Sequence, residues 1–538
     1  MTVTDVPQRA RRPLPTAGRW LFIAGVACVT AGVVLQIPDV AMVIDAHRMP
    51  DDMDMQNGMG MDDMGMPAGM SMWTTSMVAG MLLEVVGLVA AVFGLFRDAP
   101  RQVGAGGVAP EAIEHGELRP IHAVTYLVLT VALVVDIMKP LTIGFVLPGM
   151  REEYGVSEAV VSVLPLVALT GTAIGSIVWG LLGDRFGRRT ALLLATLLFV
   201  ATSACGAMPT FSWNLVMCFL MGCSAGGLLP LVFTLVAELT PRRHRGWVAV
   251  ALGGVGGLGG YLAASGAAFY LEPGYTWRIL WLIGLPTGLL LLALSPLIPE
   301  SPLFLLRIGR REQAEAVLRR YGSHLREPQE PVPADSGQRP GALALIRQYP
   351  TATAVIGIVG IVWGLVNFGF LVMLPSQLHN SGMVGGAASG VLARSALYSA
   401  PALIVVVLLY MYWHGRRSLA LFIAATAVGL GGIALWSARG TNGALLVFSV
   451  GMLVLALSGI NAMLLPYSAE IYPTALRATG SGFAAAATKV GGVLGPSAML
   501  LMLKLDGGLR VPAFVLGALG LASAALMLKW GARANQPV

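Results

Sequence analysis

Residues 180–190 read Gly180-Leu181-Leu182-Gly183-Asp184-Arg185-Phe186-Gly187-Arg188-Arg189-Thr190, between two apolar runs at 157–181 and 190–208. Each run is long enough to cross a bilayer whose apolar interior is about 30 Å thick. The glycines permit a sharp turn, and the arginines favour the cytoplasmic side of a membrane. The stretch therefore predicts a tight cytoplasmic loop between two membrane-spanning helices.

Composition indicates a polytopic membrane protein. The chain has 538 residues, of which 56% are hydrophobic and 12% are charged, with 67 glycines. Its net charge of +7 comes from arginines between apolar runs rather than from a basic soluble domain, so we expect no nucleic-acid partner. Motifs typical of a nucleophile elbow (222–226) and a dinucleotide fingerprint (254–259) lie inside predicted spanning helices. We therefore expect helix-packing faces there, and no enzyme.

The apolar runs predict fourteen spanning helices. Two come first, at 20–44 and 73–96, and twelve follow at 123–148, 157–181, 190–208, 213–237, 247–271, 277–297, 351–375, 386–412, 418–437, 443–466, 481–503 and 511–530. If the N-terminus is cytoplasmic, the basic loops at 184–189, 242–245, 307–347 and 416–417 all fall inside, as the positive-inside rule requires. The C-terminus is then cytoplasmic too, and we expect a multi-pass protein of the plasma or inner membrane.

The predicted organisation follows from these runs. The segments are a cytoplasmic tail (1–19), a spanning hairpin (20–96) with a Met/Asp-rich extracytoplasmic loop (45–72), a cytoplasmic linker (97–120), a six-helix half (121–298), a cytoplasmic inter-half loop (299–350), a second six-helix half (351–531) and a tail (532–538). Within the inter-half loop, 303–321 predicts one short basic helix and 328–341 a Pro/Gly-rich flexible linker.

A duplication supports the two halves. The motif that starts at Glu238, with Pro241 and Arg245, recurs 232 residues later at Glu470, Pro473 and Arg477. The triplet 187–189 recurs as 415–417, 228 residues later. Many transporters are built from such repeats, bind their substrate near the middle of the membrane between them, and rock one repeat against the other.

The 180–190 stretch resembles the helix 2–3 loop signature of the major facilitator superfamily, G-x-x-x-D-R-x-G-R-R. The resemblance implies an all-α fold of two six-helix halves, here with an added N-terminal hairpin. It also implies a secondary transporter that works by alternating access. In that family a cytoplasmic ion-pair cluster locks the outward-open state, and the matching residues here are Asp184, Arg188, Arg189, Glu238 and Arg245, with Arg417, Glu470 and Arg477 in the second half.

Ionisable residues inside spanning segments are costly and usually functional. Asp136 and Lys139 lie three residues apart in the first core helix, and so on one face of it. They either neutralise each other or serve proton coupling (Asp136) and an anionic substrate group (Lys139). Glu84, in the second helix of the hairpin, is expected to pack or pair. Further candidates for substrate binding are Asn367, Arg394, Asn461 and Lys489. For Arg394 and Lys489 the alternative is that the long side chain extends from a helix end to the membrane surface.

The substrate class rests on resemblance. Residues 139–148 are similar to the first helix of aromatic-acid/proton symporters, although the second acid of their D-x-x-D motif is Lys139 here. Residues 369–375 are similar to the organic-ion branch, and the glutamine pairs of sugar porters are missing from this helix. The predicted function is proton-coupled transport of a small organic solute, such as an organic acid or ion, by a monomer in the bilayer. A non-transporting sensor with this fold is an alternative.

The loop between the first two helices points to a different chemistry. Residues 49–72 hold nine methionines and five aspartates. Thioether sulfur is a soft ligand that selects Cu(I), and the loop resembles Met-rich segments of copper transport and resistance proteins. The loop thus suggests binding of Cu(I), or of silver, outside the cytoplasm, with a copper-handling protein as the alternative function. A flexible loop that buffers oxidation is the competing interpretation. The candidate ligands are His47, Met53, Met55, Met59, Met61, Met64, Met66, Met70 and Met72.

Overall fold

The computed structural model describes residues 16–47, 74–97, 117–323, 342–383, 386–413, 415–439, 443–473 and 476–532, and these parts are helical with short connections. Fourteen helices within them are long and apolar enough to cross a membrane, which is the predicted number. Several extend about a turn beyond the apolar run that predicts them. The charged residues of the basic loops consequently lie on terminal helical turns.

The first core half contains six spans, some of them interrupted. In chain order its elements are α4 (Pro120–Glu153), α5 (Glu158–Val161), α6 (Val163–Phe186), α7 (Arg188–Ala201), η3 (Thr202–Ala207), α8 (Phe211–Leu239), α9 (Arg242–Tyr275), α10 (Arg278–Leu282), α11 (Gly284–Leu294) and η4 (Ser295–Leu297). The turn between α6 and α7 is Gly187, whose φ of 103° favours glycine.

The second half repeats this arrangement. Its elements are α15 (Pro350–Gly364), η5 (Leu365–Leu371), α16 (Val372–Asn380), α17 (Ala387–Ser399), η6 (Ala400–Ala402), α18 (Leu403–Tyr412), α19 (Gly415–Arg439), α20 (Gly443–Ile471), α21 (Arg477–Leu503) and α22 (Arg510–Trp530). The segment η5 is a π-helical turn inside the seventh core span. Such turns are frequent at functional sites.

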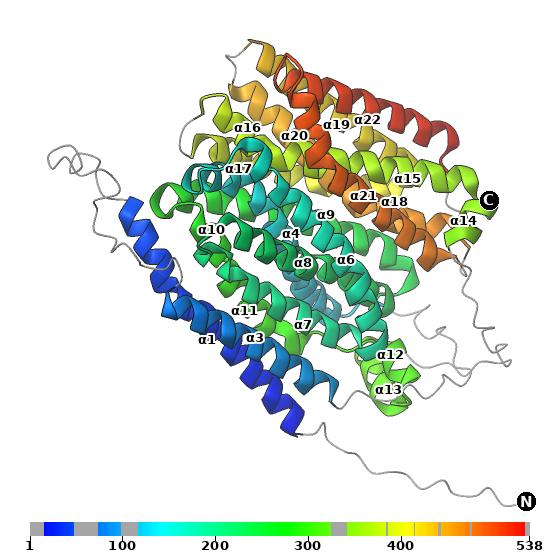
Figure 1. The fold of residues 1–538 in the computed structure, drawn as a ribbon. Coiled ribbons are helices and arrows are strands. Elements are labelled where there is room, and N and C mark those ends of the chain that lie inside the picture. The colour runs from blue at the N-terminus through cyan, green and yellow to red at the C-terminus, as the bar shows by residue number, and fades with distance from the viewer. Residues whose placement is uncertain are drawn as a thin grey trace, which may run out of the picture.

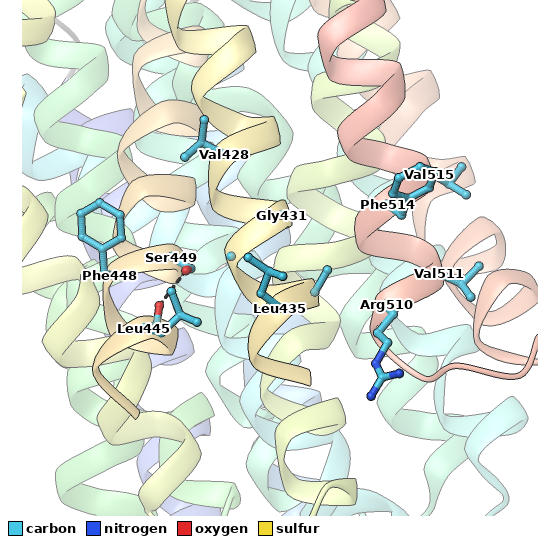
Figure 2. Close-up of a pocket in the computed structure, with 12 residues that line it drawn as sticks. Val428, Gly431, Leu435, Leu445, Phe448, Ser449, Arg510, Val511, Phe514 and Val515 are labelled. Atoms are coloured by element: carbon cyan, nitrogen blue, oxygen red, sulfur yellow. Dashed lines mark hydrogen bonds between the residues drawn. The ribbon is translucent and has the colours of Figure 1, made fainter. Parts of the chain in front are cut away.

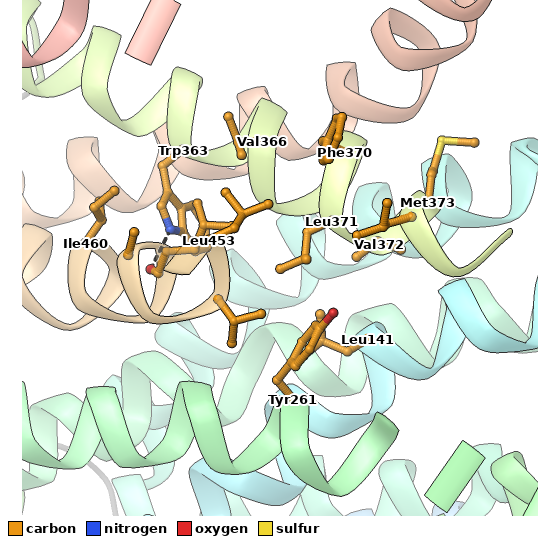
Figure 3. Packing of buried hydrophobic residues seen from close by; sticks show 14 of the residues in the cluster. Leu141, Tyr261, Trp363, Val366, Phe370, Leu371, Val372, Met373, Leu453 and Ile460 are labelled. Carbon is orange, nitrogen blue, oxygen red and sulfur yellow. Dashed lines mark hydrogen bonds between the residues drawn. The ribbon is translucent and has the colours of Figure 1, made fainter. Parts of the chain in front are cut away.

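The two halves pack directly against each other (Figure 1). Across their boundary α9 contacts α17, α18 and α20, α6 contacts α21, and α4 contacts α16. One buried hydrophobic cluster crosses the boundary, and Figure 3 shows Leu141 and Tyr261 of the first half facing Val366 and Leu371 of the second. The two backbones approach closely at Gly144, where any side chain would overlap the carbonyl of Val372.

The N-terminal hairpin consists of α1 (Thr16–His47) and α3 (Thr75–Phe96). Gly25 faces Gly87 and Gly32 faces Gly80, so close that side chains there would collide with the opposite backbone. The hairpin lies along the edge of the first half, beside α7 (Figure 1). It is therefore remote from the second half.

The inter-half segment differs from its prediction. In place of one helix over 303–321 there are two, α12 (Pro302–Arg307) and α13 (Arg311–Arg320). Gly309 between them has a φ of 75°, which breaks the helix. A further short helix, α14 (Ala342–Gln348), precedes α15. The predicted linker at 328–341 lies outside the described residues.

Candidate functional site

Two ionisable side chains from different halves, Asp136 and Lys489, lie within electrostatic range of each other. Asp136 of α4 is only 3% exposed, and its Oδ1 atom has no hydrogen-bond partner among the described residues. The opposite charge that acts on it is Lys489 of α21, on which Asp136 acts in return. A buried charge without a partner is strongly destabilising. Lys489 is thus the opposite charge that the second half brings towards Asp136, and the backbone of Leu229 supplies a further polar partner.

Lys139 does not share this site. Its Nζ atom donates to the Phe199 carbonyl at 2.7 Å and to the Thr202 hydroxyl at 2.9 Å, and it lies 4.2 Å from the centre of the Phe199 ring. These partners belong to α7 and η3. The amine thus faces the interior of the first half, and its hydrogen bonds do not go to Asp136, although the two residues are one helical turn apart.

The other predicted binding residues are distributed over the second half. Asn367 lies in the π-helical turn η5 and Asn461 in α20, and both are half-buried. Arg394 lies in α17 with an exposed side chain. Their role in binding remains a prediction.

Aromatic rings line the boundary between the halves. The Trp363 indole donates to the Leu457 carbonyl at 2.9 Å and meets the Phe368 ring edge-on, with 5.8 Å between ring centres. Opposite, Tyr261 of α9 is buried and its hydroxyl has no partner among the described residues (Figure 3). An unpaired buried hydroxyl is costly. It is therefore a candidate donor to a polar group of a bound solute.

The basic-loop cluster forms around the buried guanidinium of Arg188. It pairs with Asp184 at 2.8 Å and with Glu238 at 3.4 Å, and it donates to the Gly183 carbonyl at 3.1 Å. Arg245 donates to the Thr240 carbonyl at 3.4 Å. Asp184, Arg188 and Glu238 all belong to the first half, so the pairs among them tie α6, α7 and α8 together.

Two members of this cluster were not among the predicted site residues. The Ser301 hydroxyl donates to the Glu238 carboxylate, and Glu300 accepts from the backbone N–H groups of Arg189 and Ser301 at 3.1 and 3.0 Å. Burial is the largest influence on Glu300 and raises the pKa of its carboxyl group. The inter-half segment is thereby fastened to the first half.

The described residues at the equivalent end of the second half make different contacts. Arg416, the repeat equivalent of Arg188, donates to the Gly531 carbonyl at 3.1 Å, and Glu470 accepts from Tyr410 at 2.5 Å. Arg417 has an exposed side chain, and the side chain of Arg477 lies outside the described part of the structure. The position equivalent to Asp184 is Tyr412, so the acid that completes the first cluster has no counterpart.

Polar contacts also join the halves at the opposite end of the bundle. Gln377 and Asn380 of α16 both donate to Glu158 of α5, at 3.0 and 3.2 Å. Beside them, within the first half, buried Arg278 pairs with Glu153 and donates to the Gly206 carbonyl at 2.6 Å. Neither set was predicted, because both join residues far apart in sequence. The contacts of Gln377 and Asn380 with Glu158 thus connect the two halves at this end.

A groove of about 820 Å³ lies between α19, α20 and α22 (Figure 2). Its lining is almost wholly apolar, and Phe448 and Phe514 on its two sides are exposed. It lies within the second half and away from the boundary. It is therefore a membrane-facing feature and not the site between the halves.

The predicted copper ligands cannot be placed. Met53 to Met72 lie outside the described residues, and so does the side chain of His47, which ends α1. Copper binding by this loop stays a prediction.

Comparisons with known proteins agree with this architecture. The family model "Sugar (and other) transporter" matches residues 145–528. The niacin transporter NiaP of Acinetobacter baylyi is 27% identical to this chain, over 72% of this chain and 89% of the NiaP chain. A gallate transporter of Pseudomonas putida is 28% identical, over 77% of this chain and 93% of the gallate transporter. The proton:xylose symporter XylE of E. coli has the same fold, with a TM-score of 0.61 at 20% identity over 77% of this chain and 96% of that chain.

Proposed function

Because this chain belongs to the sugar (and other) transporter family of the major facilitator superfamily, whose members are transporters and not enzymes, we propose that it carries an aromatic carboxylic acid together with protons. The observation that carries the proposal is that buried Asp136 and half-buried Lys489, one residue from each half, lie within electrostatic range of each other. As the halves move, Asp136 can take up and release a proton, and Lys489 can bind and release an anion.

The charges suggest the following cycle. A proton that binds to Asp136 removes the counter-charge of Lys489, and the lysine is then available to bind a substrate carboxylate. When the carboxylate leaves, Lys489 again needs a partner, and Asp136 meets that need only after it has released its proton. Loading of proton and substrate is therefore linked, because an unpaired buried charge is unfavourable at every step.

The ring system of the substrate is inferred from the aromatic lining. At the boundary between the halves, Trp363, Phe368 and Tyr261 offer flat apolar surfaces and one hydroxyl without a hydrogen-bond partner among the described residues. Aromatic rings prefer to pack against other rings in offset or edge-to-face arrangements. The niacin and gallate transporters support the same class, since both compounds are aromatic carboxylic acids.

We also infer that the basic-loop end faces the cytoplasm, because its arginines then obey the positive-inside rule. The contacts of Gln377 and Asn380 with Glu158 would in that case seal the extracytoplasmic side. Release of those contacts, with closure at the basic-loop end, would expose the site to the other side of the membrane.

The test is uptake by purified protein in liposomes under an inward proton gradient. Labelled niacin, gallate and benzoate should accumulate, while xylose should not. Lys489→Met should abolish uptake, and Lys504→Met, at the exposed end of the same helix, should not affect it. Accumulation of xylose alone, or full activity of Lys489→Met, would reject the proposal.

A further inference from the structure

The apolar groove between α19, α20 and α22 runs along the membrane-facing side of the second half (Figure 2). Val428, Gly431 and Leu435 line it from α19 at helical spacing. Because a helix rises about 1.5 Å per residue, these positions extend over about 10 Å of the helix axis. The apolar part of one leaflet is about 15 Å thick, half of the bilayer interior. The groove is thus long enough to hold much of one acyl chain.

A glycine keeps the groove open. Apart from its own stretch of helix, a side chain built on Gly431 would meet no described atom within 4 Å. The neighbouring Gly432, by contrast, lies against α20, where a side chain would overlap Ser449 Oγ. Gly432 therefore lets α19 and α20 approach each other, and Gly431 leaves a hollow beside their contact.

The hollow has the size and the lining of a ligand site. Its volume of about 820 Å³ lies within the range of about 300–1,000 Å³ that is typical of small-molecule sites. Phe448 of α20 and Phe514 of α22 form its two sides, and both rings are exposed. The Ser449 hydroxyl donates to the Leu445 carbonyl at 2.6 Å, so this polar group already has a partner. The walls therefore suit a hydrocarbon chain better than a polar solute.

A cationic group lies at one end of the groove (Figure 2). Arg510, the first residue of α22, is the only charged side chain among the described residues that line the groove. Its Nη2 atom donates to the Ser437 carbonyl at 3.1 Å, which places the guanidinium group at the C-terminal turn of α19. A guanidinium group has five N–H donors in a planar fork that matches a phosphate group. An apolar hollow and a group that can bind phosphate thus lie side by side.

The charges near Arg510 also favour an anion. Arg439 ends α19 and Lys504 follows α21, and both are exposed, whereas Asp506 is the acidic residue between α21 and α22. Because α19 begins in the basic-loop motif 415–417, this end of the helix lies opposite to the basic loops. The positive-inside rule favours arginine and lysine on one side of the membrane, so it does not account for the cations at this end.

We propose that this groove binds an anionic phospholipid, with the phosphate group on Arg510 and one acyl chain in the hollow over Gly431. A phospholipid has its phosphate group at the level of the helix ends and its chains along the helices, which is the order of the cationic group and the apolar walls here. The bound lipid would link α19, α20 and α22 at the end where Arg510 lies. The proposal does not depend on which solute the protein carries.

The experiment is native mass spectrometry of the purified full chain in detergent, titrated with dioleoylphosphatidylglycerol or with dioleoylphosphatidylcholine. The anionic lipid should bind about fivefold more tightly, because the choline group of the other lipid is repelled by the cations. Arg510→Gln should weaken binding of the anionic lipid about tenfold, since a hydrogen bond between charged groups is lost. Arg439→Gln is the matched control and should have a much smaller effect, because Arg439 does not line the groove.

A second variant fills the hollow. Gly431→Leu meets no described atom, so it should fold normally and keep the test decisive even if Arg510→Gln does not fold. It should remove tight binding of the anionic lipid, whereas Gly482→Leu, at an open glycine of α21 outside the groove, should not. The melting temperature should rise with the anionic lipid and not with inorganic phosphate, which separates a lipid headgroup from a free anion.

Four results would overturn the proposal. They are equal affinity for the two lipids, unchanged affinity of Gly431→Leu for the anionic lipid, stabilisation by inorganic phosphate alone, and a dimer that Gly431→Leu dissociates. The last result would mean that a second copy of the chain, and not a lipid, covers the groove.

Discussion

Glu238→Gln tests the basic-loop cluster most sharply, because it removes charge while it preserves shape. Arg188 and Glu238 are each only 7% exposed, with 3.4 Å between Nε and Oε1. The glutamine oxygen can still accept the Ser301 hydroxyl. The change therefore isolates the loss of one charge from a buried pair.

The expected free-energy cost of Glu238→Gln depends on the partners that Arg188 keeps. Loss of one partner of a buried pair costs about 3–5 kcal/mol. Arg188 retains Asp184 at 2.8 Å and the Gly183 carbonyl, so we expect the low end, about 3 kcal/mol. If one conformation alone contains the pair, that energy changes its population by about 100-fold. Asp184 is 53% exposed, so Asp184→Asn should cost only about 0–1 kcal/mol.

Two measurements follow from this difference. Distances between spin labels at exposed Arg243 and Arg417, one in each half, report the population of each conformation, and initial uptake rates report function. Glu238→Gln should shift the distance distribution and slow uptake far more than Asp184→Asn, at similar expression. An equal effect of the two variants, or no effect of either, would refute the role of the buried pair.

Three further predictions concern other contacts. Burial raises the pKa of the Glu300 carboxyl group, so the folded state favours its protonated form. The stabilising contribution of the protonated carboxyl group is fully present below about pH 4.5 and is lost as the pH rises through the raised pKa. Glu300→Gln should therefore flatten the fall of the melting temperature above pH 4.5. A result in which Glu300→Gln keeps the full pH dependence would contradict this cause. Gly144→Val should push α4 away from the Val372 carbonyl and speed the alkylation of a cysteine introduced by Gln377→Cys. Unchanged alkylation would mean that the close approach at Gly144 does not limit access to the end of the bundle where Gln377 lies. A lysine at position 278 cannot reproduce the forked contacts of the arginine with Glu153 and the Gly206 carbonyl. Arg278→Lys should therefore lower the free energy of unfolding by about 3 kcal/mol. An unchanged melting temperature would be incompatible with these forked contacts.

Hydropathy and internal repetition were sufficient to predict the spans and the fold class. A helix in lipid must satisfy its own backbone and expose apolar side chains, so each span leaves a local signal in the sequence. The repeat of the Glu238 motif at Glu470 carried the same information about the two halves. These features depend on neighbouring residues, and a single sequence contains them.

The partners of the buried charges could not be predicted in this way. Helical spacing places Asp136 and Lys139 on one face, yet the long lysine stem carries its amine to the Phe199 carbonyl. The charge that meets Asp136 comes from Lys489 in the other half. Glu300 likewise acquires its role only when the inter-half segment folds back onto the α6–α7 turn. Such choices are set by tertiary contacts between distant residues.

Proton coupling through Asp136 is the central claim, and accumulation against exchange in liposomes tests it most directly. The wild-type protein should concentrate labelled niacin when an inward proton gradient is imposed. Asp136→Asn should lose this accumulation and still exchange labelled for unlabelled niacin at equal concentrations, because Lys489 remains to bind the carboxylate. Gradient-driven accumulation by Asp136→Asn at the wild-type level would contradict the role of this carboxylate.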